Sequence, residues 1–93
     1  MATLSFKQNG ECYEAEFKAN ADYALHIERK VKGKISIQQR STESGEYADC
    51  ILPTWVKDAG KVLDVSISHG VYPMNVKIIS DTEVALGEYK EAQ

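Results

Sequence analysis

The side chains that most often carry out chemistry are few in this sequence: two histidines, His26 and His69, and two cysteines, Cys12 and Cys50. None of them stands at the Cys-x-x-Cys or His-x-x-x-His spacing that is typical of a metal site. A nucleophilic cysteine with a histidine base has no local signature here, and no glycine-rich loop could cradle a phosphate. We therefore expect a protein that is not an enzyme and that holds no metal and no cofactor.

The charged residues are more informative, because they are unevenly distributed. The chain has a net charge of −3, yet four of its eleven basic residues fall within residues 29–34, in the stretch RKVKGKISI. A basic segment on an acidic protein is typical of a contact with a negatively charged partner. The same lysines could instead blunt an exposed β-edge against aggregation. The residues of this segment that we expect to bind are Arg29, Lys30, Val31, Lys32 and Lys34.

We predict that this basic segment is the tip of a β-hairpin. A three-residue loop over residues 31–33 places Lys30 directly opposite Lys34. It also places Arg29 opposite Ile35 and so keeps Ile35 on the apolar face, whereas a two-residue loop would turn Ile35 outward. Two lysines placed opposite each other destabilise a sheet by about 0.2–1 kcal/mol, so folding alone does not explain them.

The elements that must position these residues are strands, because apolar residues recur at every second position along most of the chain. No segment has a sustained helical period. We expect Val84 and Leu86 to face the core, and Pro73 favours an edge or a bulge for the strand that contains it. The seven or eight predicted strands lie within residues 2–7, 11–18, 22–31, 34–40, 47–52, 61–68, 71–80 and 83–88.

This pattern predicts an all-β fold, a single antiparallel β-sandwich domain over residues 1–93, with a small barrel as the alternative. The number and spacing of the strands resemble those of immunoglobulin-like modules. The motif residues of antibody domains do not match, since Trp55 follows Cys50 and Ala48 stands where a tyrosine would be. A sandwich of this size is also similar to the decoration or head-auxiliary proteins of tailed bacteriophage. That resemblance implies a structural protein of a virion.

The expected partner of the basic segment is a larger protein with an acidic surface, such as a capsid protein, or further copies of the same chain. Nucleic acid and membranes are not expected, because the rest of the chain is acidic and its aromatic residues alternate toward the core. The alternative function is a carbohydrate-binding or adhesion module that uses Trp55 and exposed tyrosines. Trp55 could equally fill one end of the core.

The start of the chain, MATLSFKQNGE, lacks the basic and long apolar regions of a secretory signal. We therefore expect the protein in the cytoplasm or in a virion, with a mature form that has lost its leader as the alternative. No apolar run approaches the about 20 residues of a membrane-spanning helix. In a reducing compartment Cys12 and Cys50 are expected to be free thiols.

Overall fold

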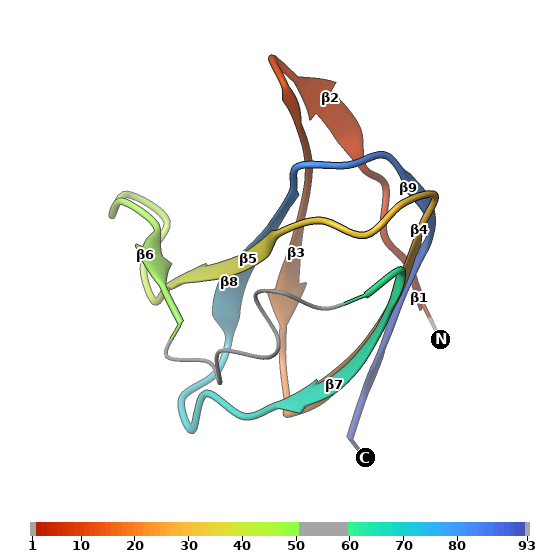
Figure 1. The fold of residues 1–93 in the computed structure, drawn as a ribbon. Coiled ribbons are helices and arrows are strands. Elements are labelled where there is room, and N and C mark those ends of the chain that lie inside the picture. Colours follow the sequence, from red (N-terminus) through yellow and green to blue (C-terminus); the bar gives the residue numbers. More distant parts are fainter. Residues whose placement is uncertain (1, 51–59, 93) are drawn as a thin grey trace.

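The chain forms β-strands throughout the part that the structure describes. The structure is a computed structural model that describes residues 2–50 and 60–92, and these residues form nine strands in two antiparallel sheets (Figure 1). The predicted all-β sandwich is confirmed. The strand count is nine instead of seven or eight, because the predicted strand 2–7 is replaced by two short strands, Ala2–Thr3 and Lys7–Asn9, which lie in different sheets. The strands are β1 (Ala2–Thr3), β2 (Lys7–Asn9), β3 (Cys12–Ala19), β4 (Tyr23–Arg29), β5 (Ile35–Arg40), β6 (Ala48–Asp49), β7 (Val62–Ile67), β8 (Met74–Ser80) and β9 (Val84–Glu91).

The longer strands alternate between the two sheets along the chain. The four-stranded sheet has the order β1-β9-β4-β7, and the five-stranded sheet has the order β2-β3-β8-β5-β6. The antiparallel pairs β1–β9, β3–β8, β4–β7 and β5–β6 are nested, like the two arms of one long hairpin that has been rolled up. This is the strand order of a jelly roll. The likeness to immunoglobulin-like modules extends to the two-layer sandwich and not to this order, because those modules keep pairs of consecutive strands in one sheet.

The core lies between the two sheets and is filled by the alternating apolar residues that the sequence predicts. Phe17 of β3 spans the gap between the sheets. Its ring lies edge-on to Tyr23, with centroids 5.1 Å apart, and stacks on Tyr89, with centroids 4.1 Å apart. The buried apolar residues are Leu4, Ala15, Ala19, Tyr23, Leu25, Ile27, Ile35, Ile37, Cys50, Leu63, Ile67, Met74, Val76 and Ile78.

One predicted core residue, Leu86, faces outward and is 37 % exposed. The reason is a β-bulge in β9: Leu86 lies opposite Glu28 and Val84 lies opposite Arg29, so Ala85 is an extra residue. An extra residue reverses the inward and outward alternation of a strand. Val84 keeps its contact with the core, as predicted.

The prediction of an edge position or a bulge for the strand with Pro73 was wrong, since β8 pairs on both sides in a continuous register. β8 lies between β3 and β5 in the five-stranded sheet. Pro73 directly precedes Met74, the first paired residue of β8, so its missing amide removes no ladder hydrogen bond. The Tyr72–Pro73 peptide bond is cis.

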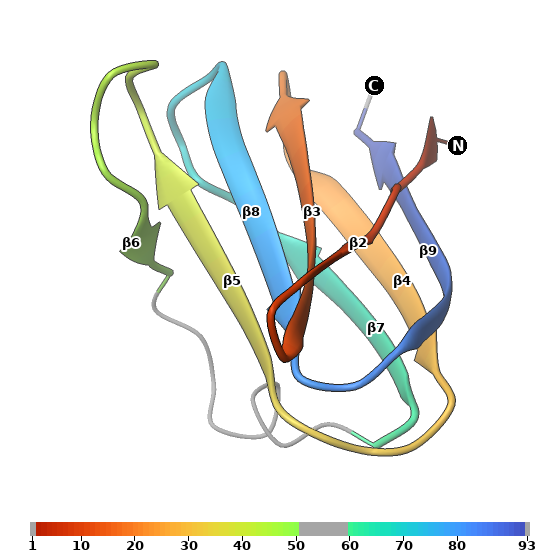
Figure 2. The same cartoon turned by 90° about the horizontal axis from the view of Figure 1, so that it is seen from above.

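The basic segment does not form the predicted hairpin. β4 belongs to the four-stranded sheet and β5 to the five-stranded sheet, so residues 30–34 cross one end of the sandwich as an arch (Figure 2). Ile35 pairs with Ser80 of β8 instead of Arg29. The alternation of apolar and polar residues along a strand indicates only which side chains face the core. Two strands on opposite sides of the core satisfy it as well as two strands side by side, which is why the pairing could not be deduced from it.

Both ends of the described chain lie at the other end of the sandwich from this arch (Figure 2). Ala2 pairs with Tyr89, and the Ala92 amide donates to the Asp22 carbonyl at 2.7 Å, next to the start of β4. The arch follows Arg29 at the far end of the same strand. The length of β4 therefore separates the chain ends from the arch.

Candidate functional site: the lysine arch

Arg29, the last residue of β4, anchors the lysine arch, as we call residues 30–34. Arg29 is buried, with only 3 % of its surface exposed. The Nη2 atom donates to the Gly60 carbonyl at 2.6 Å, and Nη1 donates to the Lys34 carbonyl at 3.4 Å. Burial lowers the pKa of the Arg29 guanidinium. Arg29 therefore holds the arch from inside, and its predicted place on the binding surface is corrected, because a buried guanidinium does not reach a partner.

The second half of the arch is held by the turn between β8 and β9. The Lys34 amide donates to Asp81 Oδ1 at 2.8 Å, and the Asp81 amide donates to the Lys34 carbonyl at 3.2 Å. Thr82 Oγ1 donates to the Val31 carbonyl at 3.2 Å. Gly33 permits this approach, since a Cβ there would overlap the Asp81 carboxylate and lie 2.7 Å from the Thr82 methyl group. The backbone of the arch is thus fixed by hydrogen bonds on both sides.

The side chains of the arch differ in their surroundings. Lys30 forms an ion pair with Glu83, with 2.9 Å between Nζ and Oε2, and this contact raises the pKa of Lys30 and offsets its charge. Lys32 and Lys34 are exposed, and neither forms an ion pair with another residue of the ranges 2–50 and 60–92. Val31, which is 55 % exposed, stands between these lysines in the sequence. The arch therefore presents uncompensated positive charge beside one apolar side chain.

Lys61 lies beside the residue that anchors the arch, and sequence analysis did not predict this position. Its carbonyl accepts a hydrogen bond from the Arg29 amide at 2.8 Å, and its side chain is exposed. The contact depends on the pairing of β4 with β7, and nothing in the local sequence around Lys61 indicates that pairing. The same holds for Asp81 and Glu83, which approach the arch from the turn that precedes β9.

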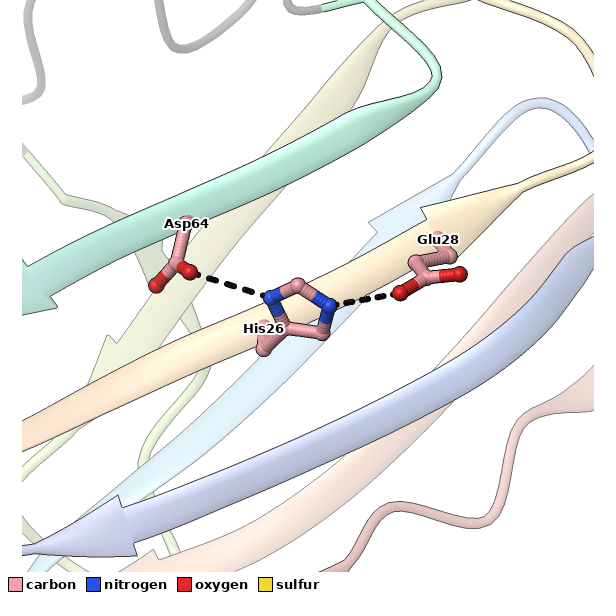
Figure 3. Close-up of polar contacts among 3 residues, drawn as sticks. All are labelled: His26, Glu28 and Asp64. Carbon is pink, nitrogen blue, oxygen red and sulfur yellow. Dashed lines mark hydrogen bonds and ion pairs between the residues drawn. The ribbon is translucent and has the colours of Figure 1, made fainter.

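A second polar cluster lies on the outer face of the four-stranded sheet (Figure 3). His26 Nε2 lies 2.7 Å from Glu28 Oε2, and His26 Nδ1 lies 3.1 Å from Asp64 Oδ2. The two carboxylates approach opposite edges of the imidazole ring, so they do not converge on one point (Figure 3). Among the residues that the structure describes, no three His, Cys, Asp or Glu side chains are grouped as metal ligands would be.

The two histidines are expected to affect stability with opposite pH dependence. Hydrogen bonds to Glu28 and Asp64 raise the pKa of His26 above its ordinary value of 6.5, whereas burial lowers the pKa of His69. The contribution of His26 to the free energy of unfolding is therefore complete at pH values below its pKa in the unfolded chain. It is lost as the pH rises through its pKa in the folded protein. The contribution of His69 to the free energy of unfolding is complete at pH values above its pKa in the unfolded chain. It is lost as the pH falls through its pKa in the folded protein.

NMR titration of the two imidazoles between about pH 5 and pH 8 tests this expectation directly. In His26→Gln, the loss of stability on the alkaline side should disappear, while the loss on the acidic side that comes from His69 should persist. A folded-state pKa below 6.5 for His26 would contradict the role of its two carboxylates.

The remaining candidates for chemistry meet at the edge of the core. Gln39 Oε1 accepts hydrogen bonds from Cys50 Sγ at 3.3 Å and from His69 Nδ1 at 2.6 Å, and His69 Nε2 lies 3.0 Å from Tyr23 Oη. Burial raises the pKa of the Cys50 thiol to about 11. The thiol is therefore protonated at neutral pH, the opposite of a nucleophilic cysteine. Cys12 and Cys50 are free thiols, as predicted.

The aromatic residues of the carbohydrate-binding alternative are mostly engaged in the fold. Trp55 lies outside the described residues. Tyr47 packs against Arg40, whose Cζ lies 4.4 Å from the ring centroid, and Tyr72 donates to the Asp22 carboxylate. No tyrosine within residues 2–50 and 60–92 is fully exposed: one is buried, Tyr23, and four are half-buried, Tyr13, Tyr47, Tyr72 and Tyr89.

Comparisons with known proteins give this chain no relative. No protein-family model matches it, and neither a curated protein nor a solved structure matches it. Within the described part of the chain, no helix has the length and the apolar character needed to cross a membrane. A function for this chain must therefore be inferred from the geometry of the molecule alone.

Proposed function

We propose that this domain is a non-enzymatic assembly module that binds an acidic surface of a larger protein through the lysine arch. One observation carries the proposal: the exposed side chains of Lys32 and Lys34 belong to a backbone that is braced from both sides. A braced loop loses little conformational freedom on binding, so more of its electrostatic attraction is available for affinity. The exposed Val31 adds apolar area at the same place.

A protein suits this surface better than a nucleic acid. Nucleic-acid sites combine broad positive charge with aromatic side chains on which bases stack. The arch has no aromatic residue, and two carboxylates, Asp81 and Glu83, lie against it and would repel phosphates. A protein partner can instead place its own carboxylates on Lys32 and Lys34 and avoid these acidic neighbours.

The class of assembly is proposed by analogy with other proteins of this architecture. Jelly rolls occur among viral capsid domains, and the size of the chain suits a decoration or head-auxiliary protein of a tailed bacteriophage. A fold does not by itself determine a function, so the analogy suggests which partner to test first, namely a large shell protein. In such a virion the arch would dock on an acidic groove of that shell protein.

The test measures the affinity of this domain for purified large proteins that are encoded beside its gene. It compares the wild type with the double variant Lys32→Glu/Lys34→Glu. We expect the double variant to bind at least about tenfold more weakly, because two attractive contacts become repulsive. Wild-type binding should also weaken when the ionic strength rises from about 0.1 M to about 1 M, since the Debye length falls from about 10 Å to about 3 Å.

The matched control is Lys7→Glu/Lys90→Glu, which changes the net charge equally at two exposed lysines far from the arch in the sequence. If the control weakens binding as much as the arch variant, the net charge and not the arch determines the association. Binding of glycans that is unaffected by either double variant would instead favour a carbohydrate-binding module.

A further inference from the structure

The strand β7 is an edge strand of the four-stranded sheet. β4 pairs with it on one side, and no strand formed by residues 2–50 or 60–92 pairs with it on the other. Natural proteins protect such edges with lysines, prolines, bulges or very short strands. The other edge strands, β1, β2 and β6, are indeed two or three residues long. β7 has six residues with a regular register, contains neither lysine nor proline, and has a single charged residue, Asp64.

The hydrogen-bond pattern determines which residues of β7 offer their backbone groups to a further strand. The Arg29 amide donates to the Lys61 carbonyl, so these two residues form a hydrogen-bonded pair at the end of the β4–β7 ladder. Such pairs alternate along an antiparallel ladder. Residues 63, 65 and 67 therefore direct their backbone groups toward β4. The free amides and carbonyls belong to Val62, Asp64 and Ser66.

We propose that β7 pairs with β7 of a second copy of this chain, antiparallel, about a two-fold axis at Val65. A two-fold axis must pass through a residue position, because an axis between residues would place inward side chains opposite outward ones. An axis at Asp64 would set two aspartates directly opposite each other, which is repulsive. An axis at Ser66 would leave fewer pairs, since β7 ends at Ile67.

The axis at Val65 satisfies both the backbone and the side chains. It makes Asp64 of one copy and Ser66 of the other a hydrogen-bonded pair, twice per dimer, so each serine hydroxyl stands opposite a carboxylate. On the inner face it places Leu63 opposite Ile67, which extends the two apolar cores toward each other. Val65, which is half-buried at the end of the core, becomes covered at the axis. The contact is isologous and closes as a dimer.

This dimer rests on observations that are independent of the proposed function. An antiparallel β7–β7 pair would direct the two lysine arches to opposite ends of the joined sheet. The reason is that Arg29, directly before the arch, donates to the carbonyl of Lys61, directly before β7, so each arch lies near the start of its own β7. The dimer would be a two-ended module, and its formation does not require the arch to bind anything.

Sedimentation velocity of the full chain between about 1 µM and about 1 mM tests the proposal, a range that covers weak and moderate dimers. We expect a reversible dimer. Ser66→Asp should weaken it by about tenfold, because it places two carboxylates opposite each other twice. Asp64→Lys/Ser66→Asp should restore it, because lysine then faces aspartate in both pairs. Ser36→Asp, on the outer face of the five-stranded sheet, should leave the dimer unchanged.

Oxidative crosslinking tests the register. Val65→Cys places one thiol on each side of the axis and should give a disulfide-linked dimer, above the level of the wild type with its own two thiols. Val62→Cys, which is exposed but lies opposite residue 68 in this register, should not. Thermal unfolding curves show whether each variant is folded. A wild type that stays monomeric throughout, a Ser66→Asp variant that dimerises as the wild type does, or a failed charge rescue in a folded double variant would overturn the proposal.

Discussion

Replacing Ile78 with alanine is expected to lower the free energy of unfolding by about 2–5 kcal/mol, the range for deleting most of a buried aliphatic side chain. Ile78 is fully buried, with 0 % of its surface exposed. It lies in β8, between Ala15 of β3 and Ile37 of β5, so strands on both sides limit how far the cavity can collapse. Urea titration followed by tryptophan fluorescence or circular dichroism measures the change.

The next residue along the strand is the matched control. Ile79 carries the same side chain on the opposite, half-exposed face of β8, between Glu14 and Ser36. Ile79→Ala should therefore lower the free energy of unfolding much less than Ile78→Ala does, because water already reaches part of the side chain that is removed. Equal losses at the two positions would mean that the inward and outward faces of β8 have been assigned wrongly.

Arg29→Ala is expected to destabilise the protein by about 2–4 kcal/mol, a large effect for a residue that sequence analysis places on a binding surface. The substitution leaves the Gly60 and Lys34 carbonyls without the guanidinium that donates to them. Hydrogen bonds from a charged donor are worth more than neutral ones. The stem of the buried Arg29 side chain also loses its packing. Chemical denaturation of the purified variant and of the wild type measures the change in the free energy of unfolding.

Two further variants separate the structural role of Arg29 from its charge. Lys30→Ala removes the same charge from the neighbouring position, where the side chain is exposed, and should leave the unfolding free energy nearly unchanged. Arg29→Lys keeps the charge but loses the planar fork that reaches two carbonyls, so it should recover only part of the stability. An Arg29→Ala protein that is as stable as the wild type would contradict the role of Arg29 in bracing the arch.

Much of the fold could be predicted because burial has a period of two along the strands. The alternation in the segment YALHIER identified the inward residues Tyr23, Leu25 and Ile27 of β4 correctly, and the same holds for Leu63 and Ile67 of β7. Alternation fails where the backbone inserts a residue, as at Ala85. It is also silent on which strand lies beside which, and this is why a hairpin was predicted where the chain crosses between sheets.

The candidate site was predicted in part, for a related reason. The local charge density pointed to the lysines of residues 30–34, and Lys32 and Lys34 are exposed as expected. The burial of Arg29 could not be predicted, since its hydrogen-bond acceptors are the carbonyl of Gly60, which precedes β7, and that of Lys34, at the far side of the arch. Lys61 was missed because only the β4–β7 pairing brings it there. Contacts made between distant segments carry no signature in either segment alone.

The pairing of the first and last strands has a practical consequence. Because Ala2 and Tyr89 are neighbours in the sheet and the arch lies past the other end of β4, anything joined to either terminus points away from the lysines (Figure 2). An enzyme, an affinity tag or a second domain attached there would leave the lysine arch unobstructed. The chain ends and the lysine arch thus occupy opposite poles of the molecule, so a fusion and a contact at the arch would not compete for space.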